Sequence, residues 1–258
     1  MTSGSELVHL EIDSGIATIT LDSPRNRNAL SAQLRGELRD RLTTATGSDQ
    51  VRVIVLTHSG TVFCSGMDLK ESRGASADNQ GVNDFPDTLR LIWNSPTPVI
   101  AKLAGPARAG GVGLVAACDL AVAASEVTFA FSEVRIGVVP AVISVPLIPQ
   151  VQPAALYELF LTGEPFDAAR AASIGLITRA VPGDQLDAEV LRYASMLRLG
   201  APGALAATKE LLRGPATSTM ADDLAAMTAL SAARFASEEG QEGIRAFVEK
   251  RKPSWAQG

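Results

Sequence analysis

Short apolar runs alternate with helix-like periods along the first half of the chain. Two of these runs are joined by Asp13-Ser14-Gly15, a turn signal that predicts a β-hairpin. Ser31 is a predicted helix N-cap, and leucines follow it at helical spacing. The alternation of strands and helices predicts an α/β core with parallel pairing. The expected strands cover residues 8–12, 16–21, 51–57, 98–103, 120–124 and 128–131.

After Pro149 the pattern becomes helical. The polar residues 71–87 lack a period and predict a loop or a weak helix beside the functional site. The last helices are too apolar for isolated surface helices, which predicts packing on the core or on another subunit. We therefore divide the chain into a core, residues 1–200, and a C-terminal helical region, residues 201–258. The expected helices cover residues 109–117, 154–161, 167–174, 187–199, 204–212, 221–235 and 238–250.

Composition narrows the class of protein. The 258 residues are 46% apolar, which is enough for a buried core, and the net charge of −5 argues against a nucleic-acid groove. Cys64 and Cys118 are the only cysteines, so no disulfide framework is indicated. The sequence shows no N-terminal targeting signal, in which a charged segment precedes an apolar one, and no apolar run of about 18 residues. We therefore expect a cytoplasmic protein that does not bind membranes.

Two glycine-centred turns are the strongest chemical signal. Residues 63–69 read Phe-Cys-Ser-Gly-Met-Asp-Leu, and residues 109–113 read Ala-Gly-Gly-Val-Gly. Each follows a strand-like run and precedes a helix-like one, so each can direct a backbone N–H to the same point. Two such donors form an oxyanion hole for a thioester carbonyl. The alternative is a pair of tight turns with no ligand.

One carboxylate follows the second turn in an apolar setting. Glu133 lies in Phe-Ser-Glu-Val-Arg-Ile-Gly, and partial desolvation there would raise its pKa and favour proton transfer. A solvated carboxylate at a strand end is the alternative. Neither His9 nor His58 lies in a catalytic motif, so no Ser/His/Asp triad is predicted, and no residues have zinc-ligand spacing.

These motifs, together with residues 21–30 and 246–253, resemble the crotonase (enoyl-CoA hydratase/isomerase) family over nearly the whole chain. The resemblance implies a spiral of ββα units with a C-terminal helical trimerisation region, and a homotrimer or homohexamer. It implies an acyl-CoA thioester substrate, with coenzyme A as part of that substrate and no permanent cofactor or metal. By motif position the oxyanion donors are the amides of Met67 and Gly110, and Glu133 is the catalytic carboxyl.

The resemblance also suggests binding residues. For the acyl pocket we consider Trp93, Gly113 and Ser144, although a helix-packing hydroxyl is the alternative for Ser144. For coenzyme A, with surface charge as the alternative for each cation, the candidates are Arg25, Arg27, Ser65, Asp68, Leu69, Phe247 and Lys250.

Gly113 departs from the family pattern. Two-glutamate hydratases carry their first catalytic glutamate at this position, so their mechanism cannot be transferred unchanged. The motif around Glu133 and Ser144 resembles the branch that contains bacterial 3-methylglutaconyl-CoA hydratases. We expect a 2-enoyl-CoA hydratase that uses an oxyanion hole and a single glutamate. The alternatives are a Δ3,Δ2-enoyl-CoA isomerase and a non-catalytic acyl-CoA binder.

Overall fold

The computed structural model describes residues 6–74, 76, 80–213 and 220–254. Its main sheet has six strands in the order β1-β2-β3-β4-β6-β9, and only the β1–β2 pair is antiparallel. A smaller sheet has the order β5-β7-β8. The strands are β1 Val8–Asp13, β2 Ile16–Leu21, β3 Val53–His58, β4 Val99–Leu103, β5 Ala107–Arg108, β6 Leu120–Ala124, β7 Thr128–Ala130, β8 Phe166–Asp167 and β9 Arg179–Val181.

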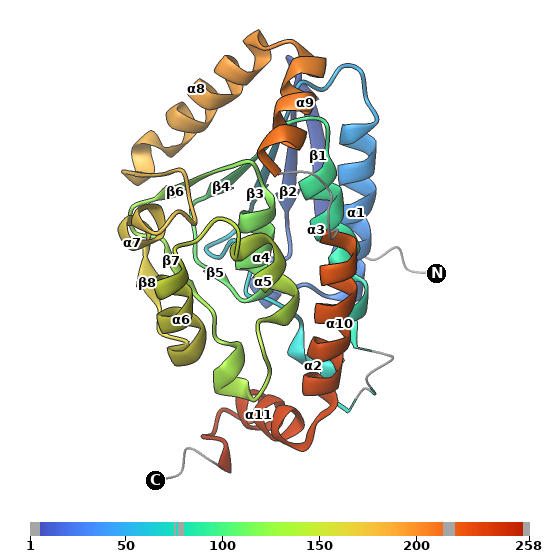
Figure 1. Ribbon diagram of the computed structural model, residues 1–258, viewed down its shortest axis with the longest axis vertical. Coiled ribbons are helices and arrows are strands. Elements are labelled where there is room, and N and C mark those ends of the chain that lie inside the picture. Colours follow the sequence, from blue (N-terminus) through green and yellow to red (C-terminus); the bar gives the residue numbers. More distant parts are fainter. Residues whose placement is uncertain (1–5, 75, 77–79, 214–219, 255–258) are drawn as a thin grey trace.

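Helices surround these sheets (Figure 1). Short 3-10 helices η1 Pro24–Asn26, η3 Gly81–Asn83, η4 Glu133–Ile136 and η5 Gly183–Gln185 connect them. The α-helices are α1 Ala32–Thr46, α2 Leu69–Ser72, α3 Phe85–Asn94, α4 Gly110–Ala117, α5 Ala141–Leu147, α6 Pro153–Thr162, α7 Ala168–Ser173, α8 Leu186–Leu199, α9 Pro202–Arg213, α10 Met220–Ala236 and α11 Glu238–Val248.

Local sequence explains how the first helix forms. The Ser31 hydroxyl accepts a hydrogen bond from the Leu34 amide at 3.3 Å, which caps α1. Leu34, Leu38 and Leu42 are buried on the face of α1 that packs against β1, β2 and α3. In β3 every residue except His58 is buried, as expected for a parallel strand that is covered on both faces.

The parallel α/β core that the alternation predicts is confirmed, and the expected strands appear with shifts of one or two residues. The polar interval 71–87 is more helical than expected. It contains η3, and α3 begins at Phe85 within it. Helices α3 and α5 were not predicted, because α3 starts inside this polar interval and α5 is only seven residues long, with Pro146 inside it.

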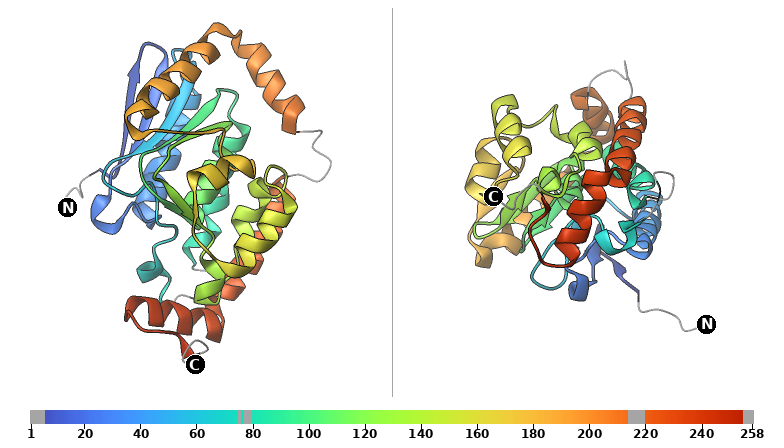
Figure 2. Two further views of the ribbon diagram at one scale, coloured as in Figure 1. Left: turned by 90° about the vertical axis from the view of Figure 1, so that its left-hand side faces the viewer. Right: turned by 90° about the horizontal axis from the view of Figure 1, so that it is seen from below.

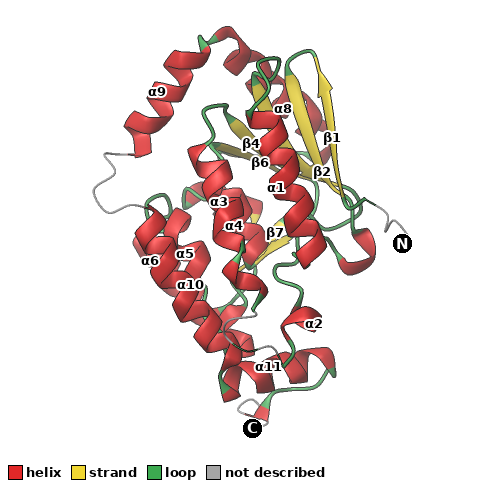
Figure 3. Cartoon of the chain, turned by 90° about the vertical axis from the view of Figure 1, so that its right-hand side faces the viewer, coloured by secondary structure: helices red, strands yellow, loops and turns green. Residues whose placement is uncertain are grey.

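The C-terminal helices differ from one another in their packing. Helix α10 lies along α5, and α11 contacts η4 at one end of the molecule (Figures 1 and 2). Helix α9 buries none of its residues and extends away from the other helices (Figure 3). Asp119 holds α9 through Lys209 Nζ at 2.6 Å and Arg213 Nη2 at 2.7 Å. Within the described residues no helix is long and apolar enough to cross a membrane.

Candidate active site

The two glycine-centred turns are in contact. The Arg108 amide donates to the Cys64 carbonyl at 2.9 Å, so the first turn runs beside β5. Gly66 has φ +90°, which favours glycine, and a Cβ at this residue would lie 2.9 Å from Ala109 Cβ and 3.5 Å from the Gly110 nitrogen. The close approach of the turns therefore depends on Gly66.

The two residues that carry the candidate oxyanion amides belong to the wall of one cavity. Met67 and Gly110 line it, and neither amide donates to the backbone of another described residue. The first turn is held by the Leu30 amide, which donates to the Gly66 carbonyl at 2.8 Å. Gly110 is the first residue of α4, so the positive end of the helix dipole adds to the donor field. This arrangement suits a developing oxyanion.

The cavity has a volume of about 420 Å³, within the range of small-molecule sites. It lies between η3, the start of α3, α4, η4, α5 and α10. Most of the side chains in its walls are apolar, and such walls suit an acyl chain. These apolar residues include Val82, Phe85, Val138, Val142, Ile143 and Phe235.

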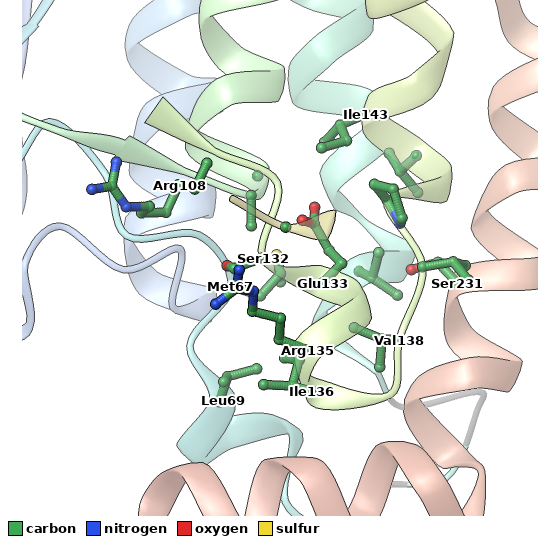
Figure 4. A pocket seen from close by; sticks show the side chains of 18 of the residues that line it. Met67, Leu69, Arg108, Ser132, Glu133, Arg135, Ile136, Val138, Ile143 and Ser231 are labelled. Atoms are coloured by element: carbon green, nitrogen blue, oxygen red, sulfur yellow. The ribbon is translucent and has the colours of Figure 1, made fainter. Parts of the chain in front are cut away.

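Glu133 is the one carboxylate that the described residues contribute to the cavity wall. It begins η4, its carboxyl points into the cavity (Figure 4), and only 8% of the residue is exposed. Its Oε2 atom has no hydrogen-bond partner among the described residues. Burial raises the pKa of Glu133 to about 7, although a hydrogen bond from its own backbone acts in the opposite direction. Near neutral pH the group can therefore take up and return a proton.

The space beside Gly113 is already filled. A Cβ at this position would lie 2.5 Å from Ile143 Cγ2, closer than real contacts allow, and 3.2 Å from Ile143 Cβ, a tight contact. Ile143 comes from α5 and is 3% exposed. The missing side chain on α4 is thus matched by a branched side chain on the neighbouring helix, and a carboxylate at position 113 would not fit without a change in α5.

The structure brings some of the predicted binding residues together and separates others. Arg27, Ser65, Leu69 and Phe247 line the same cavity as Met67, Gly110 and Glu133, whereas Arg25 and Lys250 are exposed outside its lining. The remaining predicted residues have other contacts. Asp68 caps α2 by accepting from the Lys70 amide at 3.0 Å, Trp93 stacks under the Arg213 guanidinium at 4.6 Å, and the Ser144 hydroxyl donates to the Ala141 carbonyl at 2.7 Å.

Sequence reasoning did not find several residues of the cavity wall. Ser231 and Phe235 lie one turn apart on α10, and this spacing alone is typical of a core-packing face. Arg108 is the last residue of the short strand β5, and its guanidinium donates to the Thr128 carbonyl at 2.6 Å and to the Thr128 hydroxyl at 2.7 Å. No motif in the sequence distinguishes these residues.

Other catalytic chemistries lack support in the described part of the chain. No group of three His, Cys, Asp or Glu residues there could hold a metal ion. Burial raises the pKa of the Cys64 thiol to about 12 and also raises that of Cys118, so neither is an activated nucleophile.

Comparisons with known proteins agree with this geometry. The family model for enoyl-CoA hydratase/isomerase matches residues 11–258, so the chain belongs to the enoyl-CoA hydratase/isomerase (crotonase) family. It is 36% identical over 256 residues to the mitochondrial enoyl-CoA hydratase domain-containing protein 3 of Mus musculus, which covers 94% of this chain and 82% of that protein.

Solved structures share the fold. An enoyl-CoA hydratase from Mycobacterium avium aligns with a TM-score of 0.88 and 40% identity, covering 98% of this chain and all (100%) of the other. A methylmalonyl-CoA decarboxylase in complex with 2-nitronate-propionyl-CoA aligns with a TM-score of 0.84 and 29% identity, covering 99% and 100%. The chain therefore has the crotonase fold, and the similar decarboxylase binds a CoA derivative, 2-nitronate-propionyl-CoA.

Proposed function

We propose that this protein is a hydratase that adds water to a 2-enoyl-CoA thioester, using the Met67 and Gly110 amides and the single carboxyl of Glu133. The observation that carries the proposal is a buried carboxyl whose Oε2 atom has no hydrogen-bond partner among the described residues, in the same cavity as two backbone amides that donate to no other described backbone group. The hydratase names of two similar proteins support hydration over other reactions of the family.

The amides would hold the thioester oxygen. Their hydrogen bonds withdraw electron density from the conjugated double bond, so the C3 carbon becomes electrophilic. When a water oxygen adds to C3, negative charge moves to the thioester oxygen, and both N–H groups stabilise it. Loss of one such donor typically costs about 2.7–4 kcal/mol of transition-state stabilisation.

Glu133 would handle both proton transfers. Its carboxylate takes a proton from the attacking water, and the resulting carboxylic acid gives a proton to C2, which completes the addition of one water. This double role suits a group whose pKa is raised to about 7. It needs no second carboxylate, in agreement with the closed space beside Gly113.

The second candidate is a Δ3,Δ2-enoyl-CoA isomerase. One carboxyl is enough to move a proton between C2 and C4, and Gly113 provides no side chain to hold a water. A non-catalytic acyl-CoA binder is the third candidate, which the same missing carboxylate motivates.

We further propose that coenzyme A enters with the substrate and leaves with the product, with its polar part near Arg27 and Arg108 at the cavity. We also propose a homotrimer or homohexamer in the cytoplasm. Exposed apolar side chains on the outer helices support the oligomer, because a monomer would leave them in water. They include Leu191, Met196 and Leu199 of α8 and Leu211 and Leu212 of α9.

The test is mass spectrometry of acyl-CoA products after incubation with 2-enoyl, 3-enoyl and 3-methylglutaconyl thioesters. Wild-type protein should add the mass of one water to a 2-enoyl substrate. Glu133→Gln should abolish turnover but keep thioester binding, because the amide cannot exchange protons. Glu126→Gln is the matched control, since Glu126 is exposed and lies outside the cavity lining.

The possible results separate the candidates. Unchanged mass with a shifted double bond would establish the isomerase. Binding without turnover across the panel would favour the non-catalytic binder. Full turnover by the Glu133→Gln variant would refute the assigned carboxyl in either reaction.

A further inference from the structure

The wall of the cavity that α10 forms carries one hydroxyl group. Ser231 lines the cavity and is 3% exposed, and Phe235, one turn later on the same face, is 5% exposed. One turn earlier, Thr228 satisfies its hydroxyl by donating to the Leu224 carbonyl at 2.6 Å, a common bond for hydroxyls in helices. Within the described residues the Ser231 hydroxyl makes no such bond, and it points into the cavity (Figure 4).

The positive charges of the cavity lie at the end opposite Ser231. Figure 4 shows Arg108 and Arg135 on the Met67 side of Glu133, and Ser231 on the opposite side. Arg27 belongs to the Met67 side as well, because its carbonyl accepts from the Ser65 amide at 3.1 Å. The end of the cavity near Ser231 therefore has no cation among the described lining residues.

This arrangement orients a substrate. In the proposed reaction the thioester oxygen lies at the Met67 and Gly110 amides, and the charged part of coenzyme A extends toward the arginines. The acyl chain then continues past Glu133 toward α5 and α10. An unpaired hydroxyl at that end is costly to bury unless the ligand supplies a partner.

We propose that Ser231 is a specificity residue that hydrogen-bonds an uncharged polar group, a hydroxyl or a keto oxygen, on the distal part of the acyl chain. A carboxylate is disfavoured at this end. It would be buried without a counterion, and it would lie in the same apolar cavity as Glu133. The inference rests on the proposed function for the direction of the acyl chain.

The experiment uses 2-enoyl-CoA thioesters of increasing length, each as a plain chain, with a hydroxyl on the last carbon, or with a carboxylate there. For wild-type protein we expect one length at which the hydroxylated chain has a kcat/KM about three- to tenfold above the plain chain, the gain of one hydrogen bond. Ser231→Ala should remove this preference, so that the ratio of kcat/KM for the hydroxylated chain to kcat/KM for the plain chain falls to about one. Ser173→Ala is the matched control, because Ser173 is an exposed helical serine outside the cavity lining.

Binding separates this inference from the proposed function. Calorimetry with saturated acyl-CoA ligands, plain or hydroxylated, needs no turnover and should show the same loss of preference in Ser231→Ala. If no thioester is hydrated but this binding preference appears and depends on Ser231, the proposed reaction is wrong and the polar subsite stands. Equal preference in wild type and Ser231→Ala would overturn the subsite, and so would a preference for the carboxylated chain.

Discussion

Replacing Gly113 by alanine tests whether Ile143 occupies the space that a first carboxylate would need. Gly113 lies within α4 and has no positive φ, so helix propensity alone would make alanine about 1 kcal/mol more stable. The new Cβ, however, would lie 2.5 Å from Ile143 Cγ2. Overpacking of a buried contact costs about 1–3 kcal/mol, so we expect Gly113→Ala to lose up to about 2 kcal/mol of stability.

The chain offers a matched control for this change. Gly36 also lies within a helix, α1, and a Cβ added there would meet nothing within 4 Å. Gly36→Ala should therefore raise the free energy of unfolding by the full difference in helix propensity, about 1 kcal/mol. Urea unfolding at one fixed protein concentration compares the two variants with wild type, because an oligomer's apparent stability depends on concentration.

A double-mutant cycle then identifies the partner. Ile143→Ala alone should cost about 2–5 kcal/mol, because it empties a buried site. Combined with Gly113→Ala it should cost at least about 1 kcal/mol less than the sum of the single changes, since the new methyl group enters the emptied space. If Gly113→Ala is as stabilising as Gly36→Ala, or if the two changes are additive, then Ile143 does not exclude a side chain at position 113.

Two further predictions concern the site. Burial raises the pKa of Glu133 from 4.5 to about 7, so between these pH values the unfolded chain releases a proton that the folded protein keeps, and wild-type stability falls as pH rises. In unfolding titrations, Glu133→Gln should become more stable than wild type across this window, by about 3 kcal/mol above pH ~7; parallel pH profiles would contradict this. Ala109 has φ +47° and ψ −119°, a backbone conformation that is strained for every residue except glycine. Ala109→Gly should therefore raise the free energy of unfolding by about 1 kcal/mol. A lower melting temperature in this variant would show that Ala109 is not strained.

Local patterns made much of the fold predictable. The cap at Ser31 and the buried leucines after it define α1 by nearest-neighbour rules, and β-branched runs define the central strands. Helix α3 was missed because its start at Phe85 lies inside a polar interval with no clear period. Its buried face becomes understandable only from the helices beside it, since α3 packs against α1, α4 and α10.

Local sequence likewise predicted some residues of the candidate site, whereas others depend on how distant elements pack. Met67, Gly110 and Glu133 could be predicted because turns and motifs place them by local sequence. Trp93 could not be located in this way, because whether its ring faces the cavity or Arg213 depends on the position of α9. Ile143 and Ser231 come from helices distant in the sequence from the two turns, and their roles depend on how α5 and α10 pack.

The absence of a carboxylate at Gly113 has a consequence for the chemistry of Glu133. Desolvation is the main cause of its raised pKa, and no neighbouring charge contributes. A second carboxylate in the same apolar cavity would repel the ionised form and raise the pKa of Glu133 further. At neutral pH less of the base that activates water would then be present. A glutamate at position 113 would therefore need more than the space now taken by Ile143. It would also need new hydrogen bonds to stabilise two carboxylates, and Glu133 Oε2 already has no hydrogen-bond partner among the described residues. On this argument, the proposed single-carboxyl mechanism at neutral pH depends on Glu133 being the one carboxylate that the described residues contribute to the cavity wall.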